Sequence, residues 1–283
     1  MARAWSALWR FCRRKPLGAV GGAFILTLVL VAIFAPLLTS YDPIENNIDV
    51  RLQPPSATHP LGTDQLGRDV WSRTAHGART SLSLGIGSVL MGTLFALVLG
   101  VLGGYMGGAL DMVLDRIIDA IMAFPWILLM LTLLSILGAS VLNLAVALAV
   151  AMAPRNTRVV RSAVLSLREA QYVEAAHAIG ASHLRIIGQH ILPNIMAPVM
   201  VLVSVYLGWA ILVESSASFI GFGVPPPLPS WGRTLAEEGR RFMFQAPWLA
   251  TVPGIAISLA VFGFNMLGDA LRDVLDPRMR GSQ

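Results

Sequence analysis

The side chains that could bind a metal or catalyse a reaction are few in this sequence, and their spacing favours neither. No two of the five histidines are four residues apart, the spacing that places two imidazoles on one face of a helix. The single cysteine, Cys12, excludes an intramolecular disulfide and a cysteine-based zinc site. Gly-x-Ser-x-Gly, His-Glu-x-x-His and paired-carboxylate patterns are absent from the sequence. We therefore predict neither catalytic nor metal-binding residues.

The sequence also lacks a motif for binding ATP and a pattern for relaying ions. A P-loop requires Gly-x-x-x-x-Gly-Lys-Ser/Thr, and the only lysine, Lys15, precedes a proline. Acidic residues inside a membrane usually mark an ion path, but Asp119, Glu214 and Asp269 lie at the ends of apolar segments. If transport by this chain consumes ATP, a separate chain must hydrolyse it.

The composition indicates an integral membrane protein. Of the 283 residues, 55% are hydrophobic and 13% are charged, whereas about 25% are charged in soluble domains. A net charge of +5 raises the alternative of nucleic-acid binding, but no basic stripe is interleaved with aromatic residues. We expect the lipid bilayer, and no nucleic acid, among the partners of this chain.

Long apolar segments recur along the chain, and a helix needs about 20 apolar residues to cross the hydrocarbon core. We predict an all-α integral membrane fold, a bundle of six transmembrane helices. The first, residues 17–38, exceeds the apolar region of a signal peptide and is interpreted as uncleaved. The fourth is short and either extends past Pro154 or lies partly within the protein. The other expected crossings are 81–106, 117–137 with a kink at Pro125, 141–153 (the short fourth), 194–213 and 248–267.

The predicted organisation follows from these crossings and from the distribution of basic residues. Fourteen lysines and arginines lie on the side of the two termini, and seven lie on the other side. Because positive residues collect in the cytoplasm, both termini are predicted to be cytoplasmic. The expected parts are a cytoplasmic tail 1–16, an external loop 39–80, a helical core 81–270 with a cytoplasmic segment 155–193 and an external loop 214–247, and a cytoplasmic tail 271–283.

Glycines in the second apolar segment recur at four-residue spacing, at Gly100, Gly104 and Gly108. This spacing places small residues on one face of a helix, so a neighbouring helix can approach closely. We interpret these glycines as packing positions.

The segment 155–193 is a polar interruption between apolar segments. Apolar residues recur in it at three- and four-residue spacing, which predicts one apolar helical face. Gly180 can then turn the chain, Ser182 can cap a second short helix through His190, and Pro193 is expected to end the unit. Such an element could either dock on a partner protein or rest on lipid headgroups. The apolar face comprises Val159, Val160, Ala163, Val164, Leu167, Ala170 and Val173.

The order and spacing of this segment resemble the EAA loop of ATP-binding-cassette importer permeases. The matching residues are Glu174, Ala175, Ala176, Gly180, Leu192 and Pro193. His190 stands where the general pattern has isoleucine, and a histidine before Ile-Leu-Pro-Asn is similar to the peptide-importer branch. The resemblance implies that these seven residues couple the chain to an ATPase.

Two further stretches resemble the dipeptide/oligopeptide/nickel permease family, specifically its second permease subunit. One runs from Leu61 to Arg73 and includes Asp64, Gly67, Arg68 and Asp69; the other includes Ser218, Gly221 and Trp231. These residues could contact substrate or a binding protein. Alternatively, Asp64, Arg68 and Asp69 pair within a folded loop, and residues 225–229 form a stiff polyproline turn.

The resemblance implies a type I importer in the inner membrane of a prokaryote, in which this multi-pass chain forms a heterodimer with a second permease subunit. Two ABC ATPase subunits would bind ATP and magnesium, so this chain needs no cofactor, and an extracytoplasmic solute-binding protein would deliver a dipeptide or oligopeptide. Glutathione and nickel are alternative solutes within the family. A secondary transporter or channel, and a membrane scaffold, are rival classes.

Overall fold

A computed structural model describes residues 12–13 and 15–275, and every regular element in this part of the chain is helical. Most of the two predicted cytoplasmic tails, 1–16 and 271–283, lies outside the described residues. The long helices are α2 (Pro16–Leu38), α3 (Val70–Met106), α4 (Gly108–Met122), α5 (Trp126–Leu137), α6 (Val141–Arg168), α9 (Leu192–Phe219) and α12 (Trp248–Leu275). The short ones are η1 (Ile48–Val50), α7 (Gln171–Ala178), α8 (His183–Ile186), the π-helical turns η2 (Ile187–Ile191) and η3 (Thr234–Gly239), α10 (Trp231–Arg233) and α11 (Arg240–Phe242).

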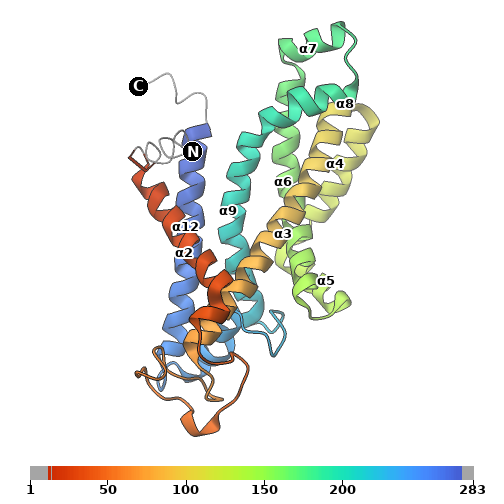
Figure 1. Cartoon of the computed structure of the whole chain (residues 1–283). Coiled ribbons are helices and arrows are strands. Elements are labelled where there is room, and N and C mark those ends of the chain that lie inside the picture. The colour runs from red at the N-terminus through yellow and green to blue at the C-terminus, as the bar shows by residue number, and fades with distance from the viewer. Residues whose placement is uncertain (1–11, 14, 276–283) are drawn as a thin grey trace.

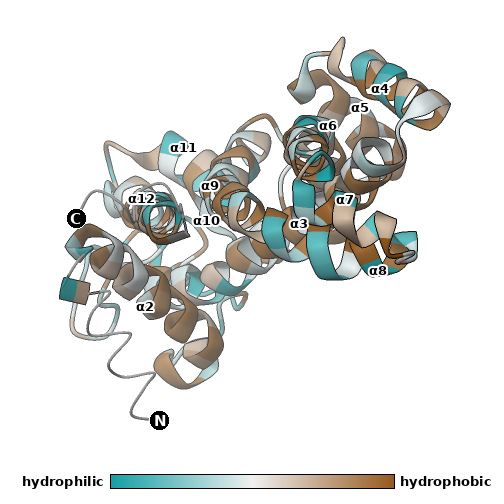
Figure 2. Cartoon of the chain, turned by 90° about the horizontal axis from the view of Figure 1, so that it is seen from above, coloured by the Kyte–Doolittle hydropathy of each residue, from teal (hydrophilic) through white to brown (hydrophobic). Residues whose placement is uncertain are grey.

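The long helices form two arms that meet at one end of the molecule (Figure 1). Helices α2 and α12 run side by side in one arm, and α3 crosses obliquely from their base to lie along α6 in the other arm. Helix α9 stands between the arms, and the view along the helices shows the same order (Figure 2). The loop before α3 lies at the end where the arms meet, and α7 and α8 lie at the opposite end.

Several helices are long and apolar enough to cross a membrane. In the described part of the chain these are Pro16–Leu38, Val70–Met106, His183–Phe219 and Trp248–Val274, and a fifth if α4 and α5 form one bent span. Helix α6 is long, but arginines follow its apolar first half. The count of six crossings and the cytoplasmic location of the termini stay predictions.

Two helices extend into segments that we predicted as external loops, because polar residues at their ends are buried and paired. Helix α3 begins at Val70, inside the predicted loop 39–80, where the Asp69 carboxylate accepts a hydrogen bond of 2.8 Å from the Ser72 amide. Helix α9 continues to Phe219, so Glu214 lies within a helix and not at the start of the loop 214–247.

The crossing expected at 117–137 is broken, not merely kinked, at Pro125. Helices α4 and α5 meet at 87°, and Pro125, which cannot donate a backbone hydrogen bond, stands immediately before α5. For the short segment 141–153, the first alternative is correct, because α6 continues through Pro154 to Arg168.

Glycine allows α3 and α6 to approach until side chains of one helix touch the backbone of the other. A Cβ atom at Gly100 would lie 2.7 Å from the Val160 side chain, and one at Gly104 would lie 3.0 Å from the Arg161 carbonyl oxygen. Gly92 makes a third contact of this kind with Met152. The packing interpretation is confirmed for Gly100 and Gly104, whereas Gly108 follows α3 and has no neighbour within 4 Å.

We predict that Gly100→Leu lowers the stability of the folded chain by about 1–3 kcal/mol or more, because the added side chain has no space against α6. Thermal unfolding in detergent measures the effect. Gly87→Leu is the matched control, because Gly87 lies on the same helix with no neighbouring atom within 4 Å. Equal melting temperatures for the two variants would contradict the close-packing interpretation.

Candidate coupling element and external charge cluster

Residues 171–186 form a compact element of two short helices and a turn, which we call the α7–α8 element. Helix α7 ends at Ala178, and Gly180 adopts a left-handed backbone conformation with φ of 78°. The Gly180 amide donates to the His177 carbonyl oxygen at 2.9 Å, and the Ala181 amide donates to that of Ala176 at 3.1 Å. This pair of bonds is a Schellman motif, which favours glycine at this position and confirms the predicted turn.

The inner face of the α7–α8 element packs against the ends of the long helices. Val173, Ala176 and Ile186 are buried, and they share one apolar cluster with Val101 of α3 and Val164 of α6. Ala176 is only 6% exposed, whereas its neighbour Ala175 is exposed. The predicted Ala175-Ala176 face is therefore split between the interior and the surface.

The predicted apolar face before the turn is largely correct. Val160, Val164 and Val173 are buried, and Ala163, Leu167 and Ala170 pack partly buried against the same cluster, but Val159 is 41% exposed.

The outer face of the α7–α8 element presents apolar side chains to the surroundings. Ile179 is 85% exposed and Leu184 is 83% exposed, one on each side of Gly180. Glu174 and Ala175 are also exposed. We call Ile179, Leu184, Glu174 and Ala175 the outer patch. Exposed apolar residues gathered at the tip of a projecting element are typical of a surface that a partner covers.

Pro193 does not end the second helix as predicted. The helical run is continuous from His183 to Phe219 and passes through the π-helical turn Ile187–Ile191. Proline has no amide hydrogen for the α-helical ladder, and the π-helical turn lies immediately before Leu192 and Pro193. His190 lies half-buried in this turn, with its ring centroid 6.1 Å from that of Tyr172, and Leu192 packs partly buried against the apolar cluster.

At the opposite end of the molecule, four buried charges form what we call the external charge cluster. Arg68 Nε donates to Asp64 Oδ2 at 2.6 Å, and Arg68 Nη2 donates to Glu238 Oε1 at 2.7 Å. Arg73 Nη2 donates to the same Glu238 oxygen at 3.0 Å, and its Nε lies 3.3 Å from Asp64 Oδ2. The two positive and two negative charges balance, and they join the first loop, α3 and the segment before α12.

The predicted external residues make contacts that support the fold of the first loop. Asp64 has no exposed surface, and Asp69 caps α3 while it contacts His59 Nδ1 at 3.0 Å. Gly67 has φ of 71°, and a Cβ atom there would collide with the backbone oxygen of Asn47. The interpretation that these charges pair within a folded loop is confirmed.

Glu214 is a further buried carboxylate, and it connects three segments. It accepts hydrogen bonds from Ser230 at 2.9 Å, from Ser218 at 3.2 Å and from Ser81 of α3 at 3.3 Å. Trp231, which is 1% exposed, donates its backbone amide to Ser81 at 3.2 Å and its indole nitrogen to the Thr74 carbonyl oxygen at 3.0 Å. Ser218 and Trp231 thus belong to one network that attaches residues 230–233 to α3 and α9.

Gly221 lies in the turn after α9 with φ of 86°, a left-handed conformation that glycine adopts without strain. Sequence reasoning missed Arg73, Glu214 and Glu238, because it assigned all three to loops. Their long-range partners lie 133 to 170 residues away in the chain, so spacing could not reveal them. The contacts of Arg73 with Asp64 and of Glu214 with Ser218 and Ser230 are closer in sequence.

Burial affects the acidity of the external charge cluster. Removal from water raises the pKa of Glu238 to about 7. The positive charge of Arg73 favours the charged form of Glu238 and opposes this shift. The charge of Glu238 therefore depends on its arginine neighbours.

Among the described residues, no group of three or more histidine, cysteine, aspartate or glutamate side chains could hold a metal ion.

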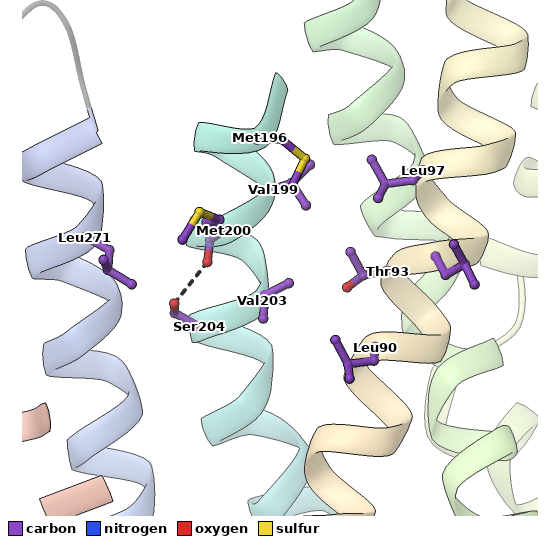
Figure 3. Close-up of a pocket in the computed structure, with 10 residues that line it drawn as sticks. Leu90, Thr93, Leu97, Met196, Val199, Met200, Val203, Ser204 and Leu271 are labelled. Carbon is purple, nitrogen blue, oxygen red and sulfur yellow. Dashed lines mark hydrogen bonds between the residues drawn. The ribbon is translucent and has the colours of Figure 1, made fainter. Parts of the chain in front are cut away.

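A groove opens between the arms on the side of the α7–α8 element. It has a volume of about 550 Å³ and lies between α3, α9 and Leu271 of α12 (Figure 3). Its lining is apolar except for the hydroxyls of Thr93 and Ser204, and the Thr93 hydroxyl has no hydrogen-bond partner.

Comparisons with known proteins agree with this architecture. Residues 81–281 match the family described as binding-protein-dependent transport system inner membrane component, and residues 4–55 match the N-terminal TM domain of oligopeptide transport permease C. A dipeptide transport system permease protein of Alkalihalophilus pseudofirmus is 44% identical over 98% of this chain and 90% of its own length. A glutathione transport system permease protein of Pectobacterium atrosepticum is 41% identical over 98% of this chain and 92% of its own length.

Among solved structures, an inward-facing conformation of the MetNI methionine ABC transporter is similar in fold. The TM-score is 0.57 at 19% sequence identity, over 71% of this chain and 94% of that chain.

We predict that Glu238→Gln lowers the stability of the folded chain by about 3–5 kcal/mol, because it removes one of the two carboxylates that balance the two buried arginines. Glu237→Gln is the control; Glu237 is half exposed and pairs only with Arg233, so a change within about 0.5 kcal/mol is expected. Thermal unfolding of the purified chain checks both. A Glu238→Gln variant as stable as Glu237→Gln would show that the cluster contributes little.

Proposed function

Because this chain belongs to the family of binding-protein-dependent transport system inner membrane components, we propose that it is the permease subunit of an ATP-driven importer. The solute proposed is a dipeptide or oligopeptide, taken up across the inner membrane of a prokaryote. Relatives named for dipeptide and peptide transport, 44% and 41% identical to this chain, support this solute class. Glutathione, for which another relative is named, is itself a tripeptide and is the second candidate.

The observation that carries the proposal is the two-sided construction of the α7–α8 element. Its outer face exposes Ile179 and Leu184, and its inner face is packed into the ends of α3, α6 and α9. A partner that binds the outer face and moves can therefore displace these helices as a rigid body. An ABC ATPase is the partner proposed, since the chain has no P-loop of its own.

The complete transporter proposed here contains this chain, a second homologous permease subunit, two ABC ATPase subunits and an extracytoplasmic solute-binding protein. ATP and magnesium are bound by the ATPase subunits and not by this chain. The groove lies between α3, α9 and α12, and the external charge cluster joins segments at the end of the molecule where the arms meet.

Reconstitution tests the proposed transport. We expect proteoliposomes that contain the two permease subunits, the ATPase subunits and the binding protein to take up a labelled dipeptide only when ATP is present on the cytoplasmic side. Liposomes without the ATPase subunits are the control and should show no uptake, even with a proton or sodium gradient. Gradient-driven uptake in that control would instead support a secondary transporter or channel.

Two adjacent alanines test the coupling surface. We predict that Ala175→Trp lowers binding-protein-stimulated ATP hydrolysis at least tenfold. The permease chain should remain folded, because Ala175 is exposed on the outer patch. Ala176→Trp should instead lower the melting temperature, since Ala176 is buried against α3 and α6. The melting temperature of each permease variant and the ATPase rate of each complex separate the two effects.

If Ala175→Trp left stimulation and assembly unchanged, the outer patch would not be the ATPase contact. The alternative, an α7–α8 element lying on lipid headgroups, predicts that outcome.

A further inference from the structure

Tyr105 connects the two helices of the α7–α8 element to α3 through one hydroxyl group. Its side chain lies at the end of α3 and is only 5% exposed. The hydroxyl lies 3.3 Å from His177 Nε2, on α7, and 3.0 Å from His183 Nδ1, on α8. The two histidines lie on opposite sides of the Gly180 turn, so a single hydroxyl contacts both.

The geometry of the rings is consistent with two hydrogen bonds at the same oxygen. The Tyr105 ring is nearly parallel to that of His177, with centroids 6.2 Å apart, and nearly perpendicular to that of His183, at 5.7 Å. A phenol has one hydrogen to donate and lone pairs to accept, and a neutral imidazole has one nitrogen of each kind. Tyr105 can therefore donate to one histidine and accept from the other.

The charged groups around Tyr105 come from α6 and α4. Arg168 Nη1 donates to the backbone oxygen of Tyr105 at 3.3 Å, and Arg161 forms a bidentate pair with Asp111 of α4. The last turn of α3 is thus bound to α6 through its backbone and to the α7–α8 element through the Tyr105 side chain.

The apolar contacts of the α7–α8 element define its orientation less specifically than the two hydrogen bonds do. Contacts of Val173, Ala176 and Ile186 bury area and hold the element against the long helices, but they are non-directional. Hydrogen bonds require alignment of donor and acceptor. Bonds from both sides of the turn to one oxygen hold both helices in a defined orientation relative to α3.

We infer that Tyr105 is a positioning residue in the coupling of ATP hydrolysis to transport. Its hydroxyl joins α7 and α8 to α3, so that a displacement of the α7–α8 element moves the transmembrane helix α3. This role rests on the proposed function, in which an ATPase moves the element. It adds a specific contact on α3, outside the residues 174–193 that the sequence pattern identified. Without the hydroxyl, the element would still dock, but part of its motion would not reach α3.

The first test is Tyr105→Phe in the complete transporter in proteoliposomes. The ring and its packing remain and only the hydroxyl is lost, so assembly, melting temperature and basal ATP hydrolysis should be retained. We expect the ratio of solute transported to ATP hydrolysed to fall at least threefold. An unchanged ratio would overturn the role of Tyr105.

The second test uses the atom through which each histidine makes its contact. The side-chain amide of asparagine reaches the position of Nδ1, and that of glutamine reaches the position of Nε2. His183→Asn and His177→Gln should therefore preserve the transport ratio, whereas the matched controls His183→Gln and His177→Asn should lower it as Tyr105→Phe does. If asparagine and glutamine were equivalent at both positions, the histidines would act by packing alone, and the inference would be wrong.

These outcomes are distinct from failure of the proposed function. Uptake by the unaltered transporter that needs no ATP hydrolysis would overturn the proposed function itself. ATP-driven uptake with an unchanged ratio in Tyr105→Phe would overturn only the inference about Tyr105.

Discussion

The structure depends on the close approach of α3 to α6, which is possible because glycine stands at the contacts. In a bilayer, apolar surface alone does not drive helices together, since lipid tails are equally apolar. Association then depends on dense packing, and at Gly92, Gly100 and Gly104 the side chains of α6 rest almost on the backbone of α3. This pair forms the rigid body to which both ends of the molecule are attached.

The two ends of that rigid body are stabilised by different kinds of interaction. At the end where the arms meet, Asp64, Arg68, Arg73 and Glu238 balance one another's charge, and Glu214 is held by three serine hydroxyls. Buried charge is unfavourable unless it is paired, so these segments cannot separate without a large penalty. At the other end, apolar contacts and the Tyr105 hydroxyl hold the α7–α8 element, and a groove separates the helices. One end is thus held by paired buried charges, whereas the other presents exposed apolar side chains on a projecting element.

Much of the architecture could be predicted because a membrane imposes simple rules on sequence. Apolar length predicted α2 and the central parts of α3, α9 and α12, and Pro125 marked the break before α5. The ends of the helices could not be predicted in this way. Residues 70–80 and Glu214 are polar or border polar residues, so their hydropathy predicted loops. In the structure they lie in helices, and Glu214 accepts hydrogen bonds from Ser81 and Ser230. Within the α7–α8 element, the turn at Gly180 followed from the sequence, but the opposite roles of Ala175 and Ala176 did not.

By itself, the sequence determined that the chain is a helical membrane protein and that residues 174–193 form a turn-containing element with the pattern of a coupling loop. Composition and local spacing are sufficient for such conclusions, because both helix formation and the glycine turn depend on neighbouring residues. Only the tertiary structure decided which residues of the α7–α8 element are exposed, which charges neutralise one another, and that the Tyr105 hydroxyl contacts both His177 and His183. The contacts of Tyr105 join residues more than 70 positions apart, and those of Arg68 and Arg73 with Glu238 span still longer separations, which no local pattern encodes.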